Sequence, residues 1–291
     1  MHSIHSRRAV LSVAAALAFW PSPALSQQGG SVVLLAQRQV KTYLSALADV
    51  HCTETVVQEK LAENGEVEAS AREQFDYLIM INGHEDDFQL TESRIENPGW
   101  HHKLLSTPML LTNGMATALL IFDPYYRDSF DFKALPEERM DGREVIPVQF
   151  AHIPGRRTPA ALVLGGREYP LELEGTAWLV EDSGEVMKID ANLLHDMSDI
   201  GLHGLTIHVE YKPVQLGANH SEILMPAQAV VDVASARHHW HNTHFFGNYR
   251  SFSADAEQAP SVKVHVTQPE ETDPSRVVKP ALPTDDSKEN H

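Results

Sequence analysis

The sequence has 291 residues, of which 42% are hydrophobic and 22% charged, and its formal net charge is -17 at pH 7. Because nucleic acids and anionic membranes select surfaces rich in Lys and Arg, this charge argues against both as partners. Cys52 is the one cysteine, so an internal disulfide is excluded and stability must come from a hydrophobic core.

The start of the chain has the features of a secretory signal peptide. Arg7 and Arg8 form a basic region, an apolar run extends over residues 9–20, and Ala24-Leu25-Ser26 is a small-x-small cleavage pattern. The apolar run has 12 residues, whereas a membrane span needs about 20. No cysteine follows the cleavage pattern, so a lipid anchor has no acceptor. We therefore expect residues 1–26 to be removed and the mature protein to be periplasmic or secreted, without a membrane span.

The rest of the chain divides by composition into a domain and a tail. Residues 27–255 contain the hydrophobic patterns that follow, and they are long enough for one sizeable domain. Residues 256–291 are rich in proline and acidic side chains and almost free of aromatic ones. Such a composition buries too little apolar surface to fold, so we expect a disordered tail.

Hydrophobic periodicity in the domain predicts a helix followed mainly by strands. Residues 31–48 repeat apolar side chains at helical spacing, which predicts an amphipathic helix. From Cys52 onward the period changes to two, which is typical of strands with one buried face. The helix would bury Val33, Ala36, Val40, Tyr43, Leu44 and Leu47, and the strands Phe75, Tyr77, Ile79, Ile81, Phe130, Phe132, Leu205, Ile207, Val209 and Tyr211.

Turn signals connect these strands into antiparallel neighbours. Five dipeptides favour tight hairpins: Asn64-Gly65, Asn82-Gly83, Asp141-Gly142, Gly165-Gly166 and Ser183-Gly184. Within residues 107–124, apolar side chains lie on more than one helical face, which predicts a short helix that is either wholly buried or shares a cavity with a ligand. The fold class is therefore α+β, with one large curved antiparallel sheet.

Four segments resemble the closing half of the LolA/LolB-like lipoprotein-carrier superfamily. They are "GTAWLVEDSGEVMKIDA" (175–191), "TIHVEYKPVQ" (206–215), "ILMPAQAVVDV" (223–233) and "FGNYRSFSA" (246–254). The resemblance implies that residues 27–255 form an incomplete β-barrel with helices on its concave side. In that family the concave face binds acyl chains or a partner protein. The same fold supports different functions, so the resemblance does not make the chain a carrier.

Catalytic motifs are absent from the sequence. It contains no G-x-S-x-G, H-E-x-x-H, Walker loop or G-x-G-x-x-G. As a nucleophile, Cys52 would need a basic partner, but its neighbour His51 points to the opposite face of a strand. We therefore interpret Cys52 as a small core residue or a surface thiol, predict no cofactor, and do not expect an enzyme.

The stretch "ARHHWHNTHFF" (236–246) contains four histidines. As a strand it places His239 and His241 on one face, and a pair of this kind can hold a transition metal. Zinc sites normally have at least three protein ligands, however, and nothing in the sequence brings a third ligand to the pair. We therefore expect a strand on a wet surface and no metal site, with His239 and His241 as weak candidates.

The sequence thus predicts an exported binding protein that holds a lipid or acyl chain between a concave sheet and a helical lid. The alternative is an envelope protein-interaction or sensor module that uses the same concave face, and a metal-dependent enzyme is a distant third. The residues predicted to line the ligand site are Tyr77, Ile79, Met115, Leu119, Leu120, Phe122, Phe132, Val209 and Tyr211.

Overall fold

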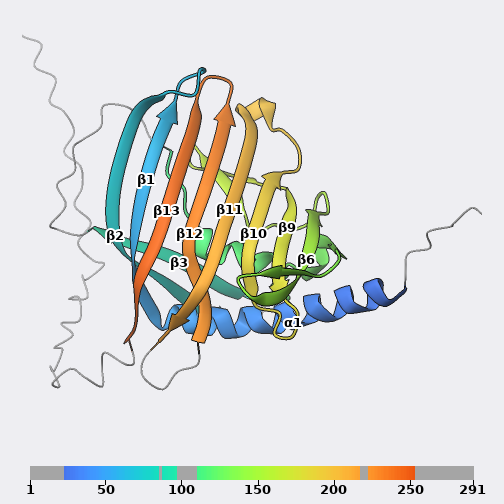
Figure 1. Ribbon diagram of the computed structural model, residues 1–291. Helices are drawn as coiled ribbons and strands as arrows, with labels where there is room; N and C mark the ends of the chain where they lie inside the picture. The colour runs from blue at the N-terminus through green and yellow to red at the C-terminus, as the bar shows by residue number, and fades with distance from the viewer. Residues whose placement is uncertain (1–22, 85–86, 97–109, 217–221, 253–291) are drawn as a thin grey trace, which may run out of the picture. The chain divides into compact units, whose positions relative to one another are not determined.

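One large antiparallel sheet dominates the computed structural model, which describes residues 23–84, 87–96, 110–216 and 222–252 (Figure 1). Eleven strands form this sheet, in the order β3-β2-β1-β13-β12-β11-β10-β9-β6-β4, with β5 paired to β6. The two ends of the order, β3 and β4, do not pair with each other, so the sheet stays open. The strands are β1 (Val50–Leu61), β2 (Val67–His84), β3 (Asp87–Glu96), β4 (Phe130–Ala134), β5 (Glu138–Met140), β6 (Arg143–His152), β9 (Leu173–Val180), β10 (Val186–Leu193), β11 (Leu202–Gln215), β12 (Glu222–Ser235) and β13 (His239–Ser251).

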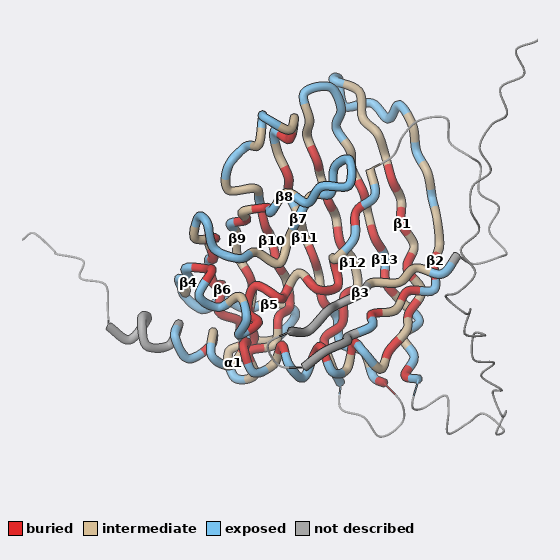
Figure 2. Tube along the Cα trace, turned by 180° about the vertical axis from the view of Figure 1, so that it is seen from behind, coloured by how far each residue is buried: buried red, intermediate tan, exposed pale blue. Residues whose placement is uncertain are grey.

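Alternation of buried and exposed residues along the strands places the core on the concave side of the sheet. In β1 every second residue from Val50 to Gln58 is buried, as the period of two requires. Phe75, Tyr77 and Ile79 continue the buried face on β2, while the side chain of Ile81 lies outside the described set. Figure 2 shows this buried layer running through the middle of the strands. The predicted α+β fold with an open sheet is confirmed.

Helix α1 (Pro23–Ala48) lies across one end of the strands (Figure 1). Five of the six predicted face residues are buried, and Val32 takes the place of Val33, which is half-buried. The helix begins at Pro23 rather than at Ser31. A proline is favoured in the first turn, where its missing N–H has no helical partner to lose. The predicted cleavage site therefore lies within the helix, while residues 1–22 and the predicted tail from residue 256 lie outside the described residues.

The predicted short helix is a 3-10 helix, η1 (Met115–Phe122), on the concave side. All of its residues except Ala118 are buried, which both predicted alternatives allow. Tyr43 of α1 donates a hydrogen bond of 2.6 Å from its hydroxyl to the carbonyl of Ala116. Its ring also meets the ring of Tyr211 edge to face, with 6.2 Å between centroids. These contacts attach α1 to η1 and to β11.

Four of the five predicted turns are hairpins. Asn64-Gly65 joins β1 to β2, Asp141-Gly142 joins β5 to β6, and Ser183-Gly184 joins β9 to β10. The prediction for Asn82-Gly83 is wrong, because both residues lie inside β2 and pair with β3. The pairing of β2 with β3 overrides the preference of these two residues for a turn.

Gly165-Gly166 forms the fourth hairpin, between β7 (Ala161–Leu164) and β8 (Arg167–Pro170). In the described part of the chain these two strands pair only with each other, as a separate two-stranded sheet. The hairpin crosses the concave side in front of β10 and β11 (Figure 2). It therefore covers part of the concave face without extending the main sheet.

Candidate ligand-binding site

An apolar pocket of about 120 Å³ lies between the concave face of the sheet and the elements that cover it. Strands β11 and β12 form its floor, where Leu205 pairs with Val233 and Ile207 pairs with Val231. Residues 110–115 form one wall. Of the fourteen lining residues only Thr112 and Asn113 are polar; the apolar ones are Leu110, Leu111, Met115, Ala160, Ala161, Leu162, Leu171, Leu202, Leu205, Ile207, Val231 and Val233. A concave, largely apolar site of this kind suits an apolar ligand.

A buried ion network lies on the same concave face, on strands β1, β3 and β13. The carboxylate of Glu54 accepts hydrogen bonds from Arg94 Nε (2.5 Å), Arg94 Nη2 (2.8 Å) and His244 Nδ1 (2.8 Å). Glu54 and His244 are 0% exposed. The Arg94 guanidinium crosses the intervening strand β2 above the rings of Phe75 and Tyr77, at 5.8 and 6.0 Å from their centroids. Such a buried charge is tolerated because it is paired and hydrogen-bonded.

The network continues from His244 to the pocket wall. A carboxylate can only accept, so His244 Nδ1 carries the proton that it donates to Glu54. In the neutral ring, Nε2 then accepts from the hydroxyl of Thr112, 2.6 Å away. The Thr112 oxygen in turn accepts from Asn242 Nδ2 at 3.0 Å. Thr112, in the middle of this chain of hydrogen bonds, lines the pocket.

Backbone groups of the pocket wall are held by side chains of the same strands. The carbonyl of Leu110 accepts from Asn242 Nδ2 (2.7 Å) and from Gln58 Nε2 (3.1 Å). The backbone N–H of Gly114 donates to Glu92 Oε2 at 2.8 Å. Polar groups of β1, β3 and β13 thus fix segment 110–114 over the sheet. We call these residues the buried polar cluster: Glu54, Gln58, Glu92, Arg94, Thr112, Asn242 and His244.

Burial and charge pairing in the cluster shift several pKa values. Burial alone raises the pKa of Glu54, but the hydrogen bonds and charges of His244 and Arg94 outweigh burial and bring that pKa below its ordinary value of 4.5. For Arg94, burial lowers the pKa and the pairing with Glu54 more than reverses this. The pKa of Tyr77 is raised, first by burial and then by the Glu92 carboxylate. Glu54 and Arg94 are therefore both ionised at neutral pH.

The predicted ligand residues are distributed over several places. Met115 lines the apolar pocket, and Leu119 lines a smaller one beneath α1. Phe132 is half-buried and borders an open groove of about 450 Å³ beside β4, β6 and β9. The other six are buried in the core: Tyr77, Ile79, Leu120, Phe122, Val209 and Tyr211. That any of the nine contacts a ligand stays a prediction.

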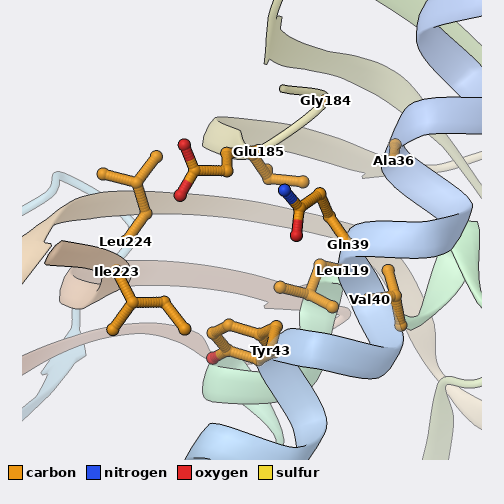
Figure 3. A pocket seen from close by; sticks show the side chains of 10 residues that line it. Ala36, Gln39, Val40, Tyr43, Leu119, Gly184, Glu185, Ile223 and Leu224 are labelled. Carbon is orange, nitrogen blue, oxygen red and sulfur yellow. The ribbon is translucent and has the colours of Figure 1, made fainter. Parts of the chain in front are cut away.

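The smaller pocket, of about 30 Å³, has room for about one or two water molecules and none for an acyl chain (Figure 3). Gln39 of α1 and Glu185 of the turn between β9 and β10 place an amide and a carboxylate at this pocket. Gly184 closes its edge with φ of +75°, and a Cβ built there would lie 2.5 Å from the backbone nitrogen of Ala36. Helix and turn are thus packed backbone against backbone at this position.

The histidine-rich stretch is a strand, as predicted, but only part of it is on a wet surface. Strand β13 starts at His239, after a turn in which the N–H of Ser235 donates to the carbonyl of His238. His239 is exposed and His241 half-buried, whereas Asn242 and His244 are 0% exposed. The expectation of a wet surface is therefore wrong for these two, because their positions alternate with His241 and face the core.

His239 and His241 share one carboxylate oxygen. Asp232 Oδ1 lies 2.8 Å from His241 Nδ1 and 3.4 Å from His239 Nε2. In the ranges that the structure describes, no group of three His, Cys, Asp or Glu side chains is placed to hold a metal ion. The pair therefore has an acidic neighbour on β12, and it stays a weak candidate for a metal site.

Cys52 is a core residue, which is one of the two predicted alternatives, and it is 4% exposed. Burial, and then the charge of Glu54, raises its pKa to about 12. We expect the thiol to stay protonated and unreactive at neutral pH. In a thiol-titration experiment, Ellman's reagent should modify less than a tenth of the protein when folded and all of it in denaturant. Rapid modification of the folded protein would contradict this burial.

Comparisons with known proteins give fold neighbours only. No family model matches the sequence, and no curated protein matches it significantly. A DUF1329 family protein from Desulfovibrio piger has 12% identity and a TM-score of 0.42, over 77% of this chain and 93% of that one. A putative outer membrane lipoprotein-sorting protein domain from Vibrio parahaemolyticus has 9% identity and a TM-score of 0.41, over 77% and 93%. A LolA superfamily protein from Nitrosomonas europaea has 11% identity and a TM-score of 0.35, over 76% and 92%.

The described residues form one large open antiparallel sheet with η1 and α1 on its concave side, which is the arrangement that the resemblance of the sequence motifs implied. Among the helices of the described residues, none combines the length and apolar character of a membrane span.

Proposed function

We propose that this protein is an exported, non-enzymatic binding protein that holds an acyl chain on the concave face of its sheet. The observation that carries the proposal is the apolar pocket, in which twelve of the fourteen lining residues are apolar. Acyl chains and lipids are the ligands whose transfer from water such a lining favours, by about 0.8 kcal/mol for each buried methylene. The signal-peptide features of residues 1–26 support export to the periplasm or beyond.

The size of the pocket limits how much of a chain it can hold. A dry, apolar cavity of about 150 Å³ admits a benzene molecule. A pocket of about 120 Å³ therefore takes roughly six carbon atoms. A longer chain has to continue beyond the pocket or displace one of its walls. The wall at residues 110–114 is held by the buried polar cluster, which leaves the β7–β8 hairpin as the wall with fewer strand partners.

Filling the pocket from its rim should abolish binding without disturbing the core. Ala160 lines the pocket, is half-buried and packs against the core, as Leu162 does two residues further on, so in Ala160→Phe the ring points into the pocket. We expect this variant to bind a fluorescent fatty-acid analogue at least tenfold more weakly than the wild type, because the ring occupies the space of about six carbons. Fluorescence titration measures the affinity, and circular dichroism confirms the fold.

The matched control is Ala48→Phe, at an exposed alanine at the end of α1. It adds the same ring away from the pocket and should bind the analogue as the wild type does. Equal losses in the two variants would place binding elsewhere. Should the wild type bind no apolar probe, the interaction-module alternative replaces the proposal. Stoichiometric metal in the purified protein would favour the third alternative, an enzyme.

A further inference from the structure

Two exposed leucines belong to the elements that cover the apolar pocket. Leu111 lines the pocket and is 64% exposed, and Leu164 near the tip of the β7–β8 hairpin is 49% exposed. A single exposed leucine needs no explanation. These two, however, belong to the two elements that cover the concave face, the segment 110–115 and the hairpin. Leu111 carries apolar surface from the pocket to the outside, and Leu164 lies on the hairpin two residues beyond the lining residue Leu162.

Strand geometry gives the direction in which Leu164 points. Leu162 lines the pocket and packs against the core. Successive side chains of a strand point to opposite faces, so Leu164 shares the inner face with Leu162, while Val163 points outward. Val163 is 63% exposed, as an outward position requires. An inward-facing side chain that is half exposed has space in front of it that the protein does not fill.

The β7–β8 hairpin is attached at its base, and among the described residues its tip does not pair with the main sheet. The Thr158 hydroxyl donates to the carbonyl of Leu171 at 2.8 Å, and the N–H of Leu171 donates to the carbonyl of Ala160 at 2.9 Å. Beyond this base, the described part of β7 pairs only with β8. The space inside the tip can therefore be filled without breaking any pairing with the main sheet.

We infer that the acyl chain continues from the pocket beneath the tip of the β7–β8 hairpin, between Leu111 and Leu164. This inference rests on the proposed function and specifies its ligand as a long-chain acyl group. The pocket holds about the first six carbons, and the two leucines cover those that follow. Leu164, which does not line the pocket, is thus a binding residue for long chains only, and the hairpin sets the preference for chain length.

Two fluorescent probes that differ only in chain length, an octanoyl and a palmitoyl analogue with the same head group, test the inference. We expect Leu164→Ser to weaken palmitoyl binding about tenfold, because it removes the burial of one leucine side chain, and to change octanoyl binding less than about twofold. Leu111→Ser should weaken the binding of both probes, because Leu111 also lines the pocket. Both positions are exposed in the free protein, so neither variant should lose stability, which circular dichroism and the melting temperature check.

The matched control is Val163→Ser, on the same strand and on the outward face, which should bind both probes as the wild type does. Equal losses for both probes in Leu164→Ser, no loss for either probe in that variant, or a loss in Val163→Ser as large as in Leu164→Ser would overturn the inference. In those cases binding of the octanoyl probe by the wild type would still support the proposed function. A wild type that binds neither probe overturns both.

Discussion

Replacing Glu54 with alanine should lower the free energy of unfolding by about 3–5 kcal/mol, because Arg94 and His244 would keep their buried positions without the carboxylate that pairs them. The size of the effect follows from burial, since Glu54 is 0% exposed and water cannot replace it. Urea denaturation followed by circular dichroism measures the loss. Because segment 110–114 is attached to the same network, the variant should also bind the palmitoyl probe more weakly.

Glu59→Ala is the control, on the same strand and on the outward face. It should change the unfolding free energy by less than about 0.5 kcal/mol, as surface substitutions usually do. If Glu54→Ala were equally mild, the buried pairing would make no net contribution to stability.

The same carboxylate makes stability depend on pH. The pKa of Glu54 in the folded state lies below the ordinary value of 4.5, so its contribution is complete above that pH and decreases as the pH falls through the folded-state pKa. The difference in unfolding free energy between the wild type and Glu54→Gln should therefore shrink on acidification below pH 4.5. A difference that stayed constant would contradict the lowered pKa.

Gly184→Ala should be destabilising by about 2–5 kcal/mol, the sum of a left-handed backbone cost and an overpacking cost. At φ of +75° an alanine is strained, and its Cβ would lie 2.5 Å from backbone atoms of Leu35 and Ala36. The turn and α1 must separate to admit it. We expect a lower melting temperature and faster tryptic cleavage after Arg38 and Lys41, which are exposed on α1.

Gly142→Ala separates the two costs. Gly142 has φ of +82° in the β5–β6 turn, and a Cβ there would have nothing within 4 Å. This variant should lose only the backbone part, about 1–2 kcal/mol, with unchanged cleavage of α1. Similar losses in both variants would show that the contact between Gly184 and α1 relaxes freely.

Local signals in the sequence were sufficient for the fold class. The buried face of α1 follows from helical spacing, and the inward residues of β11, from Leu205 to Tyr211, follow from alternation. Turn dipeptides located four hairpins. The fifth, Asn82-Gly83, was misassigned because β2 continues to His84, so that both residues pair with β3 instead of forming the turn.

The candidate site was harder to predict because it depends on strand register. Val209 and Tyr211 were expected in the ligand site, but the apolar pocket lies nearer the start of the same strand, at Leu205 and Ile207. Leu162 belongs to a hairpin whose place over the sheet has no local signal. The buried polar cluster did leave one: Glu54 and Gln58 alternate in phase with Cys52 and Val56, so both occupy inward positions. Charged residues in phase with an apolar face predict buried pairing, although not the identity of the partner.

The order of the strands also determines when the sheet can be completed during folding. β1 lies between β2, which follows it directly in the sequence, and β13, the last strand of the described residues. The hydrogen-bond partners Glu54 and His244 are 190 residues apart. Pairings between such distant parts of a chain form slowly, because the long loop between them must be closed first. Until residues 239–251 are available, β1 keeps an unpaired edge and Glu54 and Arg94 lack their third partner. The chain therefore cannot reach its folded state until β13 is available to pair with β1.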